Sequence, residues 1–161
     1  MLESTVDSVN SALKRARAIM QRRLSLSDVR EQPPIAGSSA EDEIVAKFVR
    51  AWESADLDGL VELLTDDVII SMPPMPFEYE GRDLVTRFCA MLFDAGRRFD
   101  LVPTRANGQP AFGTYLRGAA GSRHGIGLYV LTLSGTRICA MTRFENSVLP
   151  FLGLPRSLPR R

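Results

Sequence analysis

The chain has 161 residues, of which 45% are hydrophobic, and its 20 basic and 19 acidic residues leave a formal net charge of +1. This length suits one compact domain with an additional arm, and the hydrophobic content is sufficient for a sizeable core. The balanced charge excludes a general attraction to nucleic acid, and no apolar run reaches the roughly 20 residues that span a bilayer. We therefore expect a cytoplasmic protein without a membrane partner.

The first 24 residues have the pattern of an amphipathic helix. Val6, Val9, Leu13, Ala16 and Met20 recur at intervals of three and four residues, which places them on one helical face. Residues 1–30 hold six basic side chains against three acidic ones, so this end of the chain is locally positive. An exposed apolar stripe is unfavourable in water, so we expect it to pack on its own domain or on a second protomer.

Residues 25–40 are predicted to be a linker, because Pro33-Pro34 and Gly37-Ser38-Ser39 interrupt any regular element. Three helices are predicted after it, over residues 39–55, over 57–64 and from 81 onward. A short strand at residues 68–72 separates the second helix from the third and ends at Pro73-Pro74. The third helix is expected to bury Leu84, Val85, Phe88, Met91 and Leu92.

From residue 97 the apolar period changes from helical to two, which indicates strands. Four runs follow, over residues 98–105, 111–117, 125–133 and 137–145. Between them stand Asn107-Gly108 and Ser134-Gly135, turn residues of the kind that join antiparallel strands. The pattern predicts an α+β domain over 41–148, with helices on one face of a curved antiparallel sheet and residues 149–161 as a C-terminal tail.

Residues 9–18, VNSALKRARA, closely resemble the recognition helix that ends the fourth conserved region of extracytoplasmic-function sigma factors. The resemblance implies that residues 1–24 are a remnant of that region and that Asn10, Ser11, Lys14 and Arg15 contact promoter DNA in an intact factor bound to RNA polymerase core. An earlier helix normally holds the recognition helix in the major groove. Without it, we expect at most weak and sequence-indifferent DNA binding.

Further matches lie at residues 71–74 (SMPP), 79–82 (YEGR), 105–112 (RANGQPAF) and 151–155 (FLGLP). They resemble the C-terminal extension of an actinobacterial sigma factor subgroup with a SnoaL-like domain. The resemblance implies the cone-shaped fold shared by nuclear transport factor 2, ketosteroid isomerases and SnoaL-like cyclases. Such a cone encloses a cavity between sheet and helices that can hold a small apolar ligand.

Enzymes of this fold move protons with few groups, typically a carboxylate or histidine assisted by a tyrosine. The candidates for catalysis are Glu78, Tyr79 and His124. Glu78 stands among apolar neighbours that could raise its pKa, but it could equally point to solvent from a loop. His124 could act as a general base or be a solvated loop histidine. Further titratable candidates are Asp100, Tyr129 and Glu145.

The cavity wall is predicted from the large side chains on elements that must face one another across the sheet. These are Trp52, Met72, Phe77, Tyr79, Phe88, Leu92 and Tyr129. Asp66-Asp67 looks like a turn, because no third oxygen ligand is placed nearby in sequence. Cys89 and Cys139 are expected to be buried free thiols. We therefore expect neither a metal nor a cofactor.

Three interpretations of function stay open. The first is the C-terminal regulatory portion of a sigma factor, modulated by a SnoaL-like domain that binds a small hydrophobic metabolite. The second is a separate isomerase, cyclase or epoxide hydrolase that acts on a small hydrophobic substrate. The third is a binding or dimerisation module without chemistry. The stripe from Val6 to Met20 and the outer face of the predicted sheet favour a homodimer.

Overall fold

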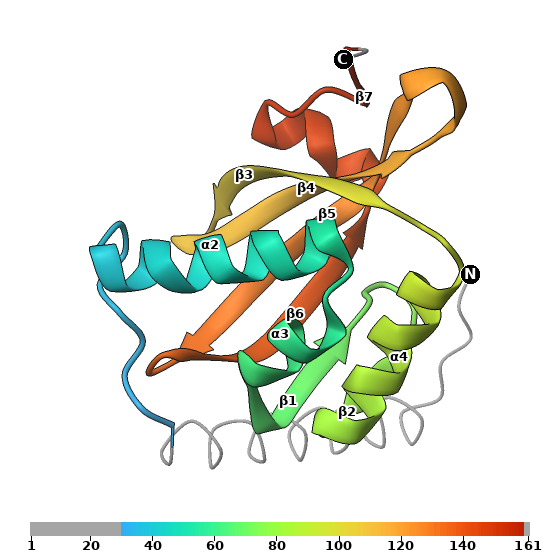
Figure 1. Cartoon of the computed structure of the whole chain (residues 1–161). Coiled ribbons are helices and arrows are strands. Elements are labelled where there is room, and N and C mark those ends of the chain that lie inside the picture. Colours follow the sequence, from blue (N-terminus) through green and yellow to red (C-terminus); the bar gives the residue numbers. More distant parts are fainter. Residues whose placement is uncertain (1–29, 160–161) are drawn as a thin grey trace, which may run out of the picture. The chain divides into compact units, whose positions relative to one another are not determined.

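Three α-helices pack on one face of a seven-stranded sheet in the computed structural model, which describes residues 30–159 (Figure 1). The helices are α2 (Ser39–Ser54), α3 (Leu57–Glu62) and α4 (Arg82–Asp94). The strands are β1 (Leu64–Ser71), β2 (Glu78–Glu80), β3 (Phe99–Ala106), β4 (Gln109–Arg117), β5 (Arg123–Ser134), β6 (Arg137–Glu145) and β7 (Ser157–Leu158). Two short 3-10 helices are η1 (Ala119–Gly121) and η2 (Asn146–Leu152).

The predicted N-terminal helix, with its apolar stripe from Val6 to Met20, lies outside the described residues. The same holds for the predicted DNA contacts Asn10, Ser11, Lys14 and Arg15. Residues Gln32–Arg161 form one compact unit by themselves.

The sheet has the strand order β2-β1-β6-β5-β4-β3, and β7 pairs with β5. All neighbours are antiparallel except β1 and β6, which run parallel. The prediction of a wholly antiparallel sheet is therefore wrong at this one pair. The reason lies in the connection, because parallel neighbours need a long crossover and the whole segment from β2 to β5 separates these two strands.

The turn between β3 and β4 has the geometry that its sequence predicts. Asn107 and Gly108 both have positive φ, at 50° and 76°, and Ala106 pairs with Gln109 on either side of them. Two central residues with positive φ form the type I′ turn, whose twist matches that of the flanking strands. A two-residue turn at Gly135 and Thr136 also joins β5 to β6, with Ser134 paired to Arg137, but there only Gly135 has a positive φ, at 53°.

Helix α2 begins at Ser39, as predicted, and Ser38 is its N-cap, because the Ser38 side chain accepts a hydrogen bond from the backbone N–H of Glu41. Ile44, Phe48 and Trp52 recur every four residues and are buried against the sheet. We call this side, which the helices cover, the inner face of the sheet.

Helix α4 presents a different side to the core from the one predicted. Val85, Cys89 and Phe93, spaced four residues apart, are its buried residues, whereas Leu84 and Met91 are exposed. The predicted buried face of this helix omitted Cys89, although we expected this thiol to be buried, and a buried cysteine behaves as a small apolar residue. Including it turns the buried stripe away from Leu84 and Met91, and Phe88 and Leu92 then lie at its edge.

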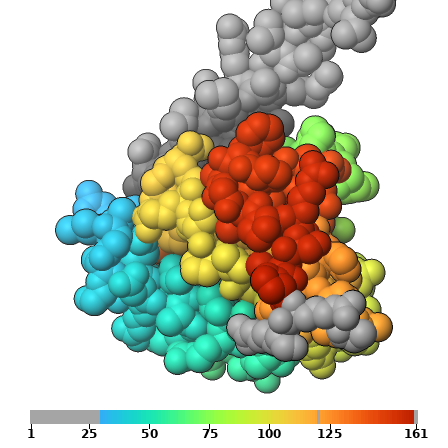
Figure 2. Space-filling model, turned by 90° about the horizontal axis from the view of Figure 1, so that it is seen from above, coloured from blue at the N-terminus to red at the C-terminus, as the bar shows by residue number. Residues whose placement is uncertain are grey.

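The outer face of the sheet carries a second apolar cluster, in which Leu149 and Leu154 pack against Ala111, Leu128 and Val130. In Figure 2 the segment that supplies the two leucines (red) borders atoms drawn in yellow and orange. The packed unit thus extends past residue 148. This segment also covers part of the face that we expected to be open, which removes one of the two reasons given for a homodimer.

An apolar cavity as candidate functional site

A cavity of about 230 Å³ lies between the helices and the inner face of the sheet. Its lining comes from α2, α4, four strands and the connections that follow β1 and α4. The lining residues are Trp52, Met72, Phe88, Leu92, Arg97, Phe99, Thr114, Ile126, Tyr129 and Arg143. Mostly apolar walls with a few polar groups that converge on them are typical of small-molecule sites.

A larger hollow of about 780 Å³ lies between α2, α3 and the turn after β5. Many of its lining residues are charged, including Glu43, Lys47, Arg50 and Arg137. Glu43 and Lys47 pair with each other at 2.6 Å, and both remain well exposed. Such a hollow is a charged surface groove, so the smaller apolar cavity is the better candidate for ligand binding.

The indole of Trp52 is held in place on several sides by aromatic rings. Its centroid lies 5.0 Å from Tyr129, 5.5 Å from Phe48, 5.6 Å from Phe93 and 6.2 Å from Phe99. These separations are typical of favourable aromatic pairs. The apolar wall of the cavity is therefore preorganised.

Two polar atoms in the cavity wall are buried without a hydrogen-bond partner among the described residues. They are Nε1 of Trp52, whose residue is 1% exposed, and Oγ1 of Thr114, whose residue is 0% exposed. Buried polar groups are nearly always paired, and leaving one unpaired costs about 1–3 kcal/mol. Both atoms belong to residues that line the cavity, so a bound molecule could supply the missing partners.

Two arginines also line the cavity. Arg143 is half-buried and donates one hydrogen bond, at 3.1 Å, to the carbonyl oxygen of Ile126. Arg97 is exposed in the connection between α4 and β3. Neither guanidinium forms an ion pair with a carboxylate of the described residues. The lining holds no carboxylate and no imidazole, so the site is positively charged.

Tyr129 is buried in the centre of β5, and burial raises the pKa of its phenol further above the ordinary value of 10. The hydroxyl is therefore neutral at physiological pH and can donate a hydrogen bond. Cys89 is buried as well, and burial raises the pKa of its thiol to about 12. Neither group provides an ionised base near neutral pH.

Five of the residues predicted for the wall, Trp52, Met72, Phe88, Leu92 and Tyr129, do line this cavity. The other two do not. Phe77 is 55% exposed before β2, and Tyr79 is half-buried in β2, where its ring centroid lies 4.9 Å from that of Phe88. Tyr79 thus packs against a lining residue without lining the cavity itself.

The three residues predicted for catalysis do not meet at the cavity. Glu78 is exposed on the edge strand β2, one residue before Tyr79. His124 is exposed near the start of β5, where its Nδ1 lies 3.1 Å from the hydroxyl oxygen of Ser157. Neither Glu78, Tyr79 nor His124 is among the lining residues. A catalytic role for them stays a prediction.

The further titratable candidates also lie away from the cavity, except for Tyr129. Asp100 is buried on β3 and pairs with Arg117 at 2.7 Å and with Arg123 at 3.5 Å. Glu145 is exposed at the end of β6. Within residues 30–159 no group of three or more metal-ligating side chains is close enough to hold an ion. No helix among these residues is both long and apolar enough to cross a bilayer.

The sequence interpretation missed five lining residues, the apolar Phe99 and Ile126 and the polar Arg97, Thr114 and Arg143. Strand periodicity carried a signal for Thr114, because it lies two residues after Phe112 and therefore on the same face of β4. The predicted wall consisted of large apolar and aromatic side chains, so it left out both Thr114 and Arg143. For Arg97, in a loop, the sequence has no corresponding signal.

Residues 45–146 match the model of the SnoaL-like domain family. The chain is also similar to the ECF RNA polymerase sigma factor SigG of Mycobacterium tuberculosis, in the strains CDC 1551 / Oshkosh and H37Rv. With each, 36% of 162 aligned residues are identical, over 96% of this chain and 42% of the relative. The chain thus spans less than half the length of these relatives.

Two solved structures give the same picture of the fold. An NTF2-like protein from Mesorhizobium loti superposes with a TM-score of 0.55 at 24% identity, over 70% of this chain and 95% of that chain. An LEH-like epoxide hydrolase from M. tuberculosis does so with a TM-score of 0.54 at 18% identity, over 73% of this chain and 90% of the other. At these identities the likeness concerns the fold alone.

Proposed function

The chain belongs to the SnoaL-like domain family, and on that premise we propose that it is the ligand-binding regulatory module of an extracytoplasmic-function sigma factor. The observation that carries the proposal is the apolar cavity with two unpartnered buried polar atoms and no acid or imidazole in its lining. The similarity to sigma factor SigG along 96% of the chain supports the regulatory context.

The composition of the lining favours binding over proton transfer. A general acid or base works best with a pKa near the operating pH. The titratable lining residues are two arginines, which are always charged, and Tyr129, whose raised pKa keeps it neutral. The lining therefore suits recognition of a ligand that it leaves unchanged.

The intact factor, in this proposal, contacts RNA polymerase core and promoter DNA in the cytoplasm, and the cavity reports the level of a small hydrophobic metabolite. Asn10, Ser11, Lys14 and Arg15 would contact the promoter only when the rest of the fourth conserved region is present. A homodimer remains part of the proposal, and it now rests mainly on the apolar stripe from Val6 to Met20.

The first test is the reading frame upstream of the Met1 codon, which should encode the other conserved regions of a sigma factor. Holoenzyme reconstituted with the complete gene product should then initiate transcription at a level that changes when the cavity is altered. Thr114→Leu, which projects a larger side chain toward the cavity, is the informative variant, and Ile35→Leu, at an exposed residue, is its control. Equal transcription by parent and Thr114→Leu, with both folded, would reject the regulatory role.

A further inference from the structure

We propose that the cavity recognises a small hydrophobic carboxylate, with its apolar body among the aromatic side chains and its carboxylate at Arg97 and Arg143. This inference rests on the proposed ligand-binding function and adds the chemical class of the ligand. Its basis is the kind of hydrogen bond that the lining can make.

The polar side chains of the lining are almost all donors. Arginine and the indole N–H donate and cannot accept, and the hydroxyls of Thr114 and Tyr129 can donate. No lining side chain is a carboxylate, an amide or an imidazole. A ligand that satisfies this set must be rich in acceptors, which a carboxylate is and an amine is not.

The charge of the site also favours a carboxylate ligand. Both guanidinium groups lack a carboxylate partner among the described residues. A planar guanidinium matches a carboxylate with two parallel hydrogen bonds, and such charge-assisted bonds are roughly twice as strong as neutral ones. A cationic ligand would instead meet two like charges with no counter-charge in the lining.

The positions of the lining residues determine the orientation of the bound ligand. Trp52, Phe99 and Tyr129 are buried, whereas Arg97 is exposed and Arg143 half-buried. The headgroup therefore binds toward the solvent side and the apolar body lies deeper. The unpartnered Trp52 Nε1 and Thr114 Oγ1 would serve a second acceptor atom or an ordered water within the cavity.

The size of the cavity limits the ligand. A volume of about 230 Å³ lies below the roughly 300 Å³ at which ordinary ligand pockets begin. A steroid or a multi-ring polyketide is too large for it, whereas one aromatic ring or a short alkyl chain with a carboxylate is the appropriate scale. Phenylacetate is therefore a suitable probe.

The experiment uses three probes of nearly equal shape, phenylacetate, phenylacetamide and phenethylamine, which are anionic, neutral and cationic. Trp52 is the only tryptophan of the chain, so its single indole N–H resonance and its fluorescence report on the cavity directly. Phenylacetate should bind at least about tenfold more tightly than the amide and shift the indole resonance, because a charge-assisted pair is lost with the amide. The amine should not bind.

Two arginine variants test the headgroup site. Arg97→Gln and Arg143→Gln should each weaken phenylacetate binding about tenfold and leave phenylacetamide binding unchanged. Arg87→Gln is the matched control, since this exposed arginine of α4 does not line the cavity. Arg97 is itself exposed, so its replacement keeps a folded variant available if Arg143→Gln unfolds.

The carboxylate assignment is overturned if phenylacetate and phenylacetamide bind equally well, or if phenylacetate does not bind. If phenyl phosphate binds more tightly than phenylacetate, the choice of a carboxylate as the headgroup is wrong. These failures differ from failure of the proposed function. Phenylacetate that binds at the arginines without changing transcription would reject the regulatory role and keep the ligand class. If transcription responds to Thr114→Leu but phenylacetate does not bind, the regulatory role stands and the carboxylate assignment is rejected.

Discussion

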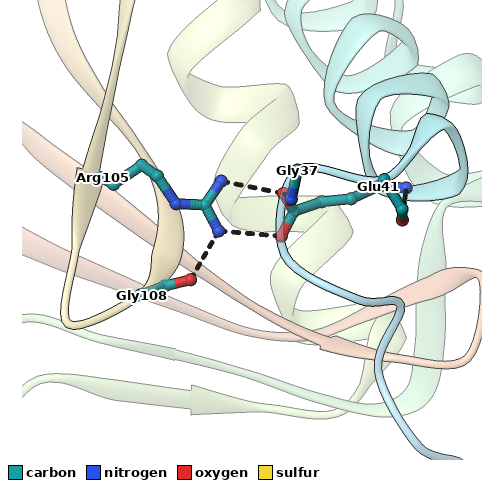
Figure 3. A network of polar contacts seen from close by, with 5 residues as sticks. Gly37, Glu41, Arg105 and Gly108 are labelled. Carbon is teal, nitrogen blue, oxygen red and sulfur yellow. Dashed lines mark hydrogen bonds and ion pairs between the residues drawn. The ribbon is translucent and has the colours of Figure 1, made fainter.

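The carboxylate of Glu41, in the first turn of α2, accepts two hydrogen bonds from the guanidinium of Arg105, at 2.8 and 3.2 Å (Figure 3). The backbone N–H of Gly37 donates a third at 2.8 Å, and Arg105 donates to the carbonyl oxygen of Gly108 at 2.5 Å. Glu41 is buried, and Arg105 is partly exposed. The pair thus joins the start of a helix to the turn between β3 and β4.

Removing the arginine should destabilise the domain, because Glu41 would stay buried without its counter-charge. We expect Arg105→Ala to lower the free energy of unfolding, by less than for a fully buried pair because water reaches the guanidinium. Urea unfolding measures this, with Arg87→Ala as the control at an exposed arginine. A loss no larger than that of the control would show that the pair contributes nothing to stability.

The same pair makes stability depend on pH. The hydrogen bond from Arg105 lowers the pKa of Glu41 below its ordinary value of 4.5, with further contributions from Gly37 and the positive charge. A carboxylate with a lower pKa in the folded state stabilises the protein above pH 4.5, and this contribution is lost as the pH falls through the folded pKa.

Unfolding measured between pH 7 and pH 2.5 should therefore show the difference between parent and Glu41→Gln shrink below pH 4.5. Glu62→Gln is the control, because Glu62 is exposed at the end of α3. A pH-independent difference for Glu41→Gln would contradict the linkage.

The buried thiols should be unreactive in the folded protein. Burial raises the pKa of Cys89 to about 12, so almost no thiolate exists at pH 8, and Cys139 is buried too. A thiol reagent such as dithionitrobenzoate should label neither cysteine until the chain unfolds, and both in guanidinium chloride. Rapid labelling of Cys89 under native conditions would show that α4 opens readily.

The C-terminal segment should contribute strongly to stability through its buried leucines. Leu149→Ala should cost about 2–4 kcal/mol, because Leu149 is completely buried in the outer-face cluster. Phe151→Ala, also in η2 but at a residue that is 88% exposed, should cost less than about 0.5 kcal/mol. Similar losses for the two variants would mean that the segment adds no specific packing.

The parts of the fold that depend on neighbouring residues could be predicted from the sequence. The four strand runs from residue 98 and the turn at Asn107 and Gly108 follow from local periodicity and backbone preference, and the structure confirms them. The first strand was predicted less well, because β1 begins at Leu64 and includes Asp66 and Asp67, for which we predicted a turn. The pairing of β1 with β6 and the ion pair between Glu41 and Arg105 join distant segments. No local pattern encodes such contacts.

The residues that line the cavity also differ in how well the sequence predicts them. Trp52 and Tyr129 could be placed in its wall from helical and strand periodicity, because large apolar side chains point inward. The polar members were missed, although strand periodicity places Thr114 on the same face of β4 as Phe112, because the predicted wall held only apolar and aromatic side chains. These are the residues on which the predicted ligand chemistry depends.

The parallel pairing of β1 with β6 also determines when the sheet can be completed during synthesis. Ser71 and Thr142, which face each other across these strands, are 71 residues apart in the sequence. During synthesis β1 emerges from the ribosome long before the strand that completes its hydrogen bonding, while each hairpin of the meander can close as soon as it is made. Closing so large a loop carries an entropic cost before any contact offsets it. The nascent domain therefore exposes one edge of β1 until β6, its last long strand, has been translated.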